Sequence, residues 1–245
     1  MKSVFANNYP GLEYIIIDGG STDGSLDYVK TWRDNLAYWV SEKDAGVYDA
    51  MNKGIQKVSG KYIMFLNSGD CLTNEKILSN ISKVVAGANA DIFYGNMLLE
   101  KEHNKIEELN YPGCLTLDFW KHATINHQSA FIKATLFKEM GLYDTRYNLA
   151  ADYAFFLKCF FNGKHFHHVD AAWVRFDTNG ISSLDKALYK KQMNEAWKKT
   201  IPVYLDKILN ENQAHKIFMN HRLMRWASNF NEKYNRLKNE GKIGE

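Results

Sequence analysis

The chain has 245 residues, of which 45% are hydrophobic and 24% are charged, and its formal net charge is +3 at pH 7. This length allows one large core with a smaller appended unit, and the composition excludes a disordered chain. The three cysteines, at positions 71, 114 and 159, contain no C-x-x-C pair, which argues against zinc or thiol redox chemistry and favours a reducing compartment.

The first half of the chain alternates apolar runs with helical patterns. Short apolar runs typical of buried strands occur at residues 13–17, 37–40 and 61–66. A helical pattern follows each of them, at residues 25–33, 45–58 and 75–85. This alternation predicts βαβ units, and therefore an α/β fold with a mostly parallel sheet that binds its ligands at the carboxyl ends of the strands.

The second half has a mixed pattern. Short strands are predicted at residues 91–94, 95–102 and 128–132, and helices at residues 134–140 and 152–161. From residue 184 onward the pattern is helical, and residues 185–245 carry 13 Lys or Arg against 7 Asp or Glu, a formal charge of +6. We therefore predict a domain spanning residues 1–184 and a basic helical extension spanning residues 185–245.

Two motifs in the first half carry residue types suited to chemistry. The first strand delivers Asp18 to the glycine-rich turn GGSTDG, whose backbone can approach a ligand closely. In the second motif, Asp44 and Gly46 open the helix that carries Tyr48. Taken alone, each segment is also typical of a solvated turn or of a capped helix that packs on a sheet.

Two further motifs supply polar residues at later strand and helix ends. In LNSGD, a strand runs directly into Asn67 and Asp70, and a carboxylate with a neighbouring oxygen ligand suits Mg²⁺ or Mn²⁺ bound mainly through substrate phosphates. The last motif begins with His127 in a predicted strand and ends with Asp152 at the start of an apolar helix. An ordinary turn, a structural histidine and a helix N-cap are the alternatives for these residues.

Together, in this order and spacing, the motifs resemble the inverting family-2 glycosyltransferases that share the GT-A fold. The resemblance covers most of the predicted domain and rests on a strand ending in DGGSTDG, then D-x-G-x-Y-D-A-M-N-K-G, a strand ending in NSGD, an H-Q strand and an A-A-D helix. Within this family, the chain is most similar to the bacterial branch that builds cell-surface polysaccharides. It implies the transfer of a sugar, with inversion, from a nucleoside diphosphate sugar of the UDP type to an acceptor hydroxyl.

The resemblance also assigns roles to individual residues. It implies that the nucleotide is bound by Asp18, Gly19, Gly20, Asp23, Asp44, Asn67 and His127. Asp70 stands in the family's metal-binding acidic motif, where Mg²⁺ or Mn²⁺ bridges to the donor diphosphate. Asp152 stands where the family places its catalytic base, which takes the proton from the acceptor hydroxyl.

The sequence departs from the family pattern at several positions. Gly19 stands where many members have a second acidic residue, and Asn67 and Gly69 stand where carboxylates often occur. Ala151 replaces the common acidic neighbour of Asp152. The amino-terminal SVFANNYPG looks like the end of a helix, so we expect the family's first strand, its loop and most of one helix to be missing, which would weaken donor binding.

These departures leave a second function open, that of a nucleotide-sugar-binding protein with impaired catalysis. A nucleotidyltransferase is disfavoured because the DGGSTDG loop contains no Lys or Arg. The resemblance implies a nucleotide-sugar donor and a saccharide or lipid-linked saccharide acceptor as partners, and no nucleic acid. We expect a cytoplasmic protein, either free or peripheral at the inner face of the membrane, whose basic extension is solvated or contacts a membrane or a second copy.

Overall fold

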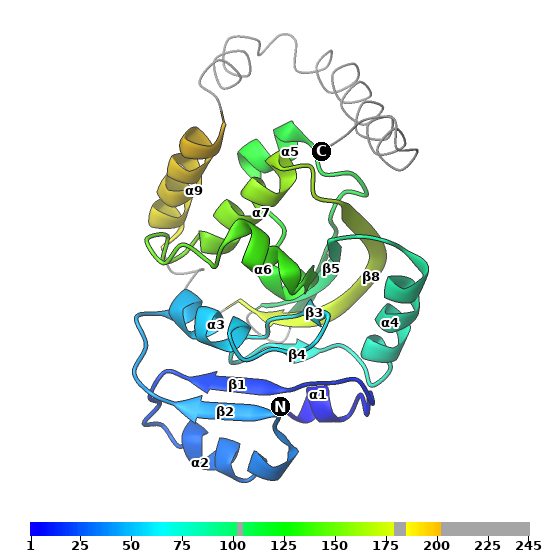
Figure 1. Ribbon diagram of the computed structural model, residues 1–245, viewed down its shortest axis with the longest axis vertical. Helices are drawn as coiled ribbons and strands as arrows, with labels where there is room; N and C mark the ends of the chain where they lie inside the picture. Colours follow the sequence, from blue (N-terminus) through cyan, green and yellow to red (C-terminus); the bar gives the residue numbers. More distant parts are fainter. Residues whose placement is uncertain (102–104, 179–184, 202–245) are drawn as a thin grey trace.

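The computed structural model describes residues 1–101, 105–178 and 185–201 of the chain (Figure 1). Within these ranges the strands form one sheet of two strands and one of six. After the short helix α1 (Lys2–Phe5), strand β1 (Ile15–Asp18) pairs in parallel with β2 (Tyr38–Ser41), and helix α2 (Ser25–Lys30) lies between them in the chain. The first predicted βαβ unit is therefore confirmed.

The six-stranded sheet has the order β3-β7-β5-β8-β4, and β6 pairs with the second half of β5, from Met97 to Lys101. Its strands are β3 (Tyr62–Ile63), β4 (Cys71–Leu72), β5 (Ile92–Lys101), β6 (Lys105–Leu109), β7 (Ala130–Lys133) and β8 (Phe166–Asp177). Strands β5 and β8 are parallel, whereas the pairs β3/β7, β4/β8, β5/β6 and β5/β7 are antiparallel. This sheet is less parallel than the alternation predicted, in part because the short connection from β5 to β6 permits only an antiparallel hairpin.

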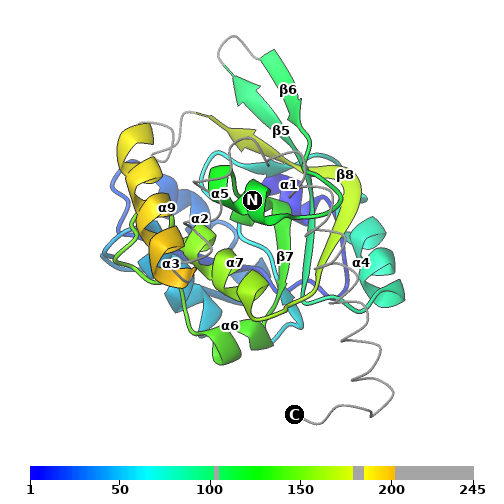
Figure 2. The ribbon, with the colours of Figure 1, turned by 90° about the horizontal axis from the view of Figure 1, so that it is seen from above.

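Helices cover both sides of the larger sheet. On one side lie α5 (Leu117–His122), α6 (Thr135–Met140) and α7 (Ala151–Phe161), and on the other lies α4 (Ile77–Gly87) (Figure 2). Helix α3 (Val47–Ile55) lies between the two-stranded sheet and the region of α6 and α7 (Figure 1). This placement lets α3 contact both the strand-end loops and the helix that carries Asp152.

Helix α7 is buried on most of its surface. Its sequence, ADYAFFLKCFF, is apolar on nearly every side, and the fully buried Tyr153, Phe156 and Leu157 pack into the main core. Helix α9 (Lys186–Thr200) packs along α7 and buries Met193 and Trp197. Each large apolar side chain buried here stabilises the fold by about 1.5–3 kcal/mol, so α7 is a rigid support for the carboxylate near its start.

Two strand predictions need correction, and part of the predicted extension lies outside the described residues. Residues His127–Ser129 form a 3₁₀ turn, η3, instead of the predicted strand start, because Ser129 bonds back to the carbonyl oxygen of Asn126 through both its N–H and its hydroxyl. The strand predicted at residues 61–66 pairs only over Tyr62–Ile63, opposite the short β7. Of the predicted extension, residues 202–245 lie outside the described residues, and no helix in the described part is long and apolar enough to cross a bilayer.

Candidate active site

Asp18 ends strand β1 and organises the loop that follows it. Its Oδ2 accepts hydrogen bonds from the backbone N–H groups of Gly20 and Ser21, at 3.1 and 3.0 Å, and from Ser41 Oγ at 2.6 Å. Its Oδ1 accepts from Ser21 Oγ at 2.5 Å. The hydrogen bonds from the two serine hydroxyls lower the pKa of Asp18 the most, so the carboxylate stays ionised and fixes the shape of the glycine-rich turn.

Gly19 lies directly against the carboxylate of Asp44. A Cβ atom at Gly19 would stand 2.4 Å from Asp44 Oδ2, so any side chain there would force the carboxylate to move. Asp44 is held by its own turn, in which Oδ1 accepts from the backbone N–H of Gly46 at 2.9 Å. The absence of an acidic side chain at position 19 is thereby explained, because the carboxylate of Asp44 fills the space that such a side chain would need.

Asp70 is anchored by three hydrogen bonds at the end of the NSGD loop. Its Oδ2 accepts from the backbone N–H of Asn67 and from Gln128 Nε2, both at 3.1 Å, and its Oδ1 accepts from the backbone N–H of Asp177 at 3.1 Å. Burial nevertheless raises the pKa of Asp70, although these hydrogen bonds act in the opposite direction. A nearby cation would stabilise the charged form of this partly buried carboxylate.

A second carboxylate borders the same loop. A Cβ atom at Gly69, where φ is +94°, would stand 2.9 Å from Asp177 Oδ2, so the last residue of β8 occupies the space beside position 69. The described residues contain no group of three or more His, Cys, Asp or Glu side chains placed to hold a metal ion. Two carboxylates nevertheless suffice for Mg²⁺, which usually keeps several waters and takes its other ligands from substrate phosphates.

Asp152 is buried near the start of α7, with 6% of its surface exposed. Its Oδ1 accepts from Tyr48 Oη at 2.8 Å and from the backbone N–H of Tyr153 at 2.8 Å, and its Oδ2 lies 2.8 Å from His127 Nδ1. Ala150 is the N-cap residue of α7, so the alternative of Asp152 as the N-cap is wrong. The carboxylate instead bonds across the interior to α3 and η3.

His127 joins Asp152 to the Asp70 loop. Its Nε2 lies 3.2 Å from Asn67 Nδ2. With the amide oriented in this way, Nε2 accepts the hydrogen bond, so Nδ1 carries the proton that it donates to Asp152 Oδ2. Four predicted site residues therefore lie in one hydrogen-bonded group: Asn67, Asp70, His127 and Asp152.

The remaining predicted residues lie at the carboxyl ends of β1 and β2. Asp18, Gly19, Gly20 and Asp44 gather there, as the contacts above show. Asp23 has a different environment, since its Oδ1 accepts from the backbone N–H of Ser25 at 3.0 Å at the start of α2. Helix α3 connects the two groups, because it begins just after Asp44 and presents Tyr48 to Asp152.

The sequence was compared with known families and with curated proteins. A model of the family described as Glycosyl transferase family 2 matches residues 1–143, more than half of the chain. The chain belongs to glycosyl transferase family 2. Among curated relatives, a PGL/p-HBAD biosynthesis glycosyltransferase of Mycobacterium bovis (strain BCG / Pasteur 1173P2) is 30% identical over 201 residues, which are 78% of this chain and 76% of that protein. An uncharacterized glycosyltransferase of Mycobacterium tuberculosis (strain CDC 1551 / Oshkosh) is 31% identical over 193 residues, 75% of this chain and 70% of that protein.

Solved structures share the fold of this chain. S. aureus TarS 1-349 in complex with UDP-GlcNAc matches with a TM-score of 0.62 at 15% identity, over 80% of this chain and 60% of that one. The mannosyltransferase PcManGT from Pyrobaculum calidifontis, in complex with GDP-Man and Mn²⁺, matches with a TM-score of 0.56 at 14% identity, over 94% of this chain and 78% of that one. The predicted GT-A fold and the predicted enzyme class, a glycosyltransferase, are confirmed.

The structure of this family-2 glycosyltransferase adds residues that the sequence did not single out. Gln128 and Asp177 both bond to Asp70, and Tyr48, which the helical stripe assigned to packing, bonds to Asp152. Gln128 directly follows His127, so the H-Q dipeptide was the sequence feature that could have indicated Gln128 as a site residue. Asp177 is 107 residues from Asp70, and nothing in the local sequence relates the two.

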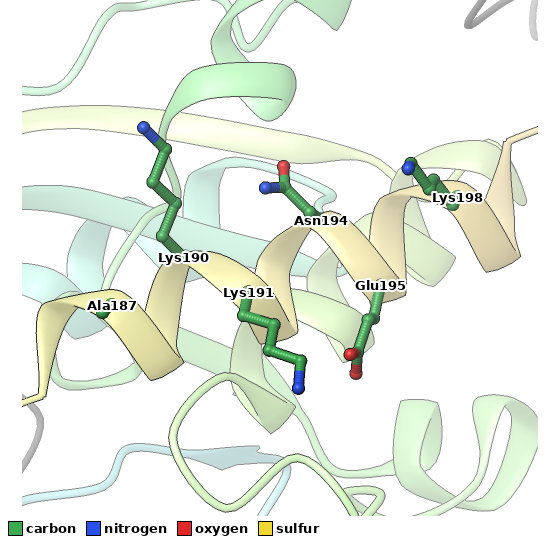
Figure 3. Close-up of a pocket in the computed structure, with 6 residues that line it drawn as sticks. All are labelled: Ala187, Lys190, Lys191, Asn194, Glu195 and Lys198. Carbon is green, nitrogen blue, oxygen red and sulfur yellow. The ribbon is translucent and has the colours of Figure 1, made fainter.

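An open pocket of about 500 Å³ lies on the exposed side of α9 (Figure 3). Its lining residues all come from that helix and are Ala187, Lys190, Lys191, Asn194, Glu195 and Lys198. None of the predicted site residues lines it. Three of the six side chains in Figure 3 are lysines, and none of the six belongs to the hydrogen-bonded group around Asp152.

The contact between Gly19 and Asp44 gives a testable prediction. Gly19→Ala is expected to weaken the binding of UDP by about tenfold, because overpacking costs about 1–3 kcal/mol and the added methyl group must displace the Asp44 carboxylate. Titration calorimetry with UDP measures the effect. Gly87→Ala is the matched control, since a Cβ there would meet nothing within 4 Å; equal affinity in the two variants would refute the prediction.

Proposed function

We propose that this family-2 glycosyltransferase transfers a sugar from a nucleoside diphosphate sugar, of the UDP type, to an acceptor hydroxyl with inversion of the anomeric carbon. The observation that supports it best is the linked arrangement of two carboxylates, the buried Asp152 and the partly buried Asp70. Asp152 bonds to His127, His127 to Asn67, and the Asn67 loop to Asp70. A single displacement at a diphosphate sugar needs one carboxylate that accepts a proton from the acceptor hydroxyl and another that binds a cation beside the diphosphate.

Asp70 would hold Mg²⁺ or Mn²⁺, with Asp177 as a second oxygen donor beside it. The fit rests on the donor set, which is two partly buried carboxylates beside the NSGD loop, and on the raised pKa of Asp70 caused by burial. When bound, the cation supplies charge stabilisation for the departing nucleoside diphosphate. The Mn²⁺ in the PcManGT complex is consistent with this proposal.

In the proposed step, Asp152 accepts the proton of the acceptor hydroxyl as that oxygen bonds to the anomeric carbon. The bond from the anomeric carbon to the diphosphate oxygen breaks with its electron pair, and the nucleoside diphosphate leaves. One displacement of this kind inverts the anomeric configuration, and burial of Asp152 keeps bulk water away from the base. The donor nucleotide is proposed to contact the loops that carry Asp18 and Asp44.

The biological setting is part of the same proposal. We infer a role in building cell-surface polysaccharide, with a saccharide or lipid-linked saccharide as acceptor, at a cytoplasmic location that includes the inner face of the membrane. The three free cysteines fit a reducing compartment. The lysines on α9, at the start of the basic extension, fit peripheral contact with an anionic surface.

The test is a transfer assay with separate measurement of donor binding. The chain is incubated with radiolabelled UDP-glucose, UDP-galactose, UDP-GlcNAc or GDP-mannose, with p-nitrophenyl glycosides as acceptors, in Mn²⁺ and in EDTA. We expect metal-dependent product from a UDP-sugar, with the opposite anomeric configuration to the donor by NMR. Donor binding without any product would favour the nucleotide-sugar-binding protein, and product of retained configuration would overturn the mechanism.

A further inference from the structure

The two oxygens of Asp152 are not equivalent. Oδ1 receives two hydrogen bonds, from Tyr48 Oη and from the backbone N–H of Tyr153, one for each of its two lone pairs. Oδ2 receives one hydrogen bond in the described part of the chain, from His127 Nδ1. A proton from an acceptor hydroxyl can therefore be taken up at Oδ2 without breaking an existing hydrogen bond.

Tyr48 is suited to act as a permanent donor to Oδ1. Burial, with the negative charge of Asp152 beside it, raises the pKa of Tyr48 well above its ordinary value, so its hydroxyl keeps its proton. The other titratable groups around Asp152 are His127 from η3 and three tyrosines, Tyr111, Tyr143 and Tyr189. Burial raises the pKa of each of these three tyrosines as well, so they are neutral near pH 7.

Helix α3 holds Tyr48 firmly in place. One turn further along the same face, Asn52 Nδ2 donates to the carbonyl oxygen of Tyr143 at 2.9 Å, and Asn52 Oδ1 accepts from the backbone N–H of Tyr143 at 3.0 Å. This pair of hydrogen bonds fixes α3 to the segment that leads into α7. Tyr48 and Asn52 both belong to the Y-D-A-M-N-K-G motif, so this part of the motif faces the helix of the base and not the nucleotide loops.

We propose that Tyr48 is a positioning residue, which saturates Oδ1 of Asp152 and so makes Oδ2 the oxygen that accepts the proton from the acceptor hydroxyl. The inference rests on the proposed function, because it gives the atom at which that function's base acts. In this proposal, helix α3, which carries the Y-D-A-M-N-K-G motif, positions the base Asp152 and also lies beside the nucleotide loops.

The test is a comparison of Tyr48→Phe with Tyr143→Phe. Each substitution removes one buried tyrosine hydroxyl from the same aromatic cluster, in which the two rings lie 5.4 Å apart. Within the described residues the Tyr143 hydroxyl has no hydrogen-bond partner, whereas the Tyr48 hydroxyl donates to Asp152 Oδ1 at 2.8 Å and also lies 3.2 Å from the carbonyl oxygen of Leu149. Loss of packing or of a polar group from the core should therefore affect both variants alike, and loss of the Asp152 hydrogen bond should affect only the first.

The measured quantities are kcat, the KM for the UDP-sugar that gives product, and the pH dependence of kcat. For Tyr48→Phe we expect kcat to fall about tenfold through lost orientation, with the donor KM changed by less than about twofold. Loss of a hydrogen bond to the carboxylate disfavours its charged form, so the acid limb of the kcat profile should move to higher pH. Tyr143→Phe should keep the profile of the unsubstituted enzyme.

The outcomes separate this inference from the proposed function. If Asp152→Asn keeps full transfer, the base of the proposed function is wrong. If Asp152→Asn is inactive but Tyr48→Phe and Tyr143→Phe have the same kcat and the same pH profile, the role given to Tyr48 alone is overturned. A rise in donor KM with an unchanged acid limb in Tyr48→Phe would also overturn it, because the helix would then serve donor binding instead.

Discussion

Asp152→Asn is expected to lower the rate of sugar transfer by about 10² or more, the usual scale for the loss of a general base, while the affinity for UDP is retained. Asparagine keeps the shape of the side chain, and its oxygen can accept from Tyr48 and from the Tyr153 N–H as Oδ1 does now. Its amide then faces His127 Nδ1, which can accept once the imidazole proton moves to Nε2 and the Asn67 amide turns its oxygen toward that nitrogen. The fold is therefore expected to survive while the proton acceptor is lost.

Two measurements check this prediction. Single-turnover transfer from the active UDP-sugar gives the rate, and calorimetry with UDP and Mn²⁺ gives the affinity. Asp144→Asn is the matched control, because this carboxylate lies eight residues earlier in the chain and pairs with Arg146 at the surface. Near-normal transfer by Asp152→Asn, or an equal loss in the control, would show that Asp152 is not the base.

The sequence predicted the features that depend on local pattern. The strand that ends at Asp18 and the helix that carries Tyr48 and Met51 follow from apolar spacing, and both are present. The meeting of Asn67, Asp70, His127 and Asp152 was implied by the family resemblance, which placed all four in one site. Their roles remain proposals, but their proximity is a property of the structure.

The contacts that the sequence could not predict join distant segments. Tyr48 and Asp152 are 104 residues apart, and Tyr48 also fits the apolar stripe of α3, so packing was a sufficient explanation for it. The sequence indicated only that an acidic residue is absent at position 19, because the carboxylate beside Gly19 belongs to Asp44, in another strand-end loop. In both cases tertiary structure gives a residue a partner that its neighbours in the chain do not reveal.

Asp70→Asn is expected to abolish the metal-dependent part of donor binding. In Mn²⁺ the affinity for UDP should fall by at least about tenfold, or about 1.4 kcal/mol, because the diphosphate loses the cation that Asp70 holds, whereas in EDTA the variant and the unsubstituted enzyme should bind alike. Higher Mn²⁺ should partly restore binding through Asp177 and the phosphates. Calorimetry with UDP at several Mn²⁺ concentrations measures both effects.

The pH dependence and the two carboxylate variants together test the separation of roles. Burial raises the pKa of Asp70, so protons compete with the cation at a higher pH than they would at an exposed aspartate, and Mn²⁺-dependent UDP binding should weaken as the pH falls toward that range. Asp27→Asn, at an exposed carboxylate on α2 that pairs with Lys30, is the control and should bind as the unsubstituted enzyme does. Because Asp152 bonds to His127 and is linked to Asp70 indirectly, through the Asn67 loop and through Gln128, Asp152→Asn should keep the Mn²⁺ dependence that Asp70→Asn loses. If the two variants lose UDP affinity equally in Mn²⁺, the assignment of one carboxylate to the cation and the other to the proton is wrong.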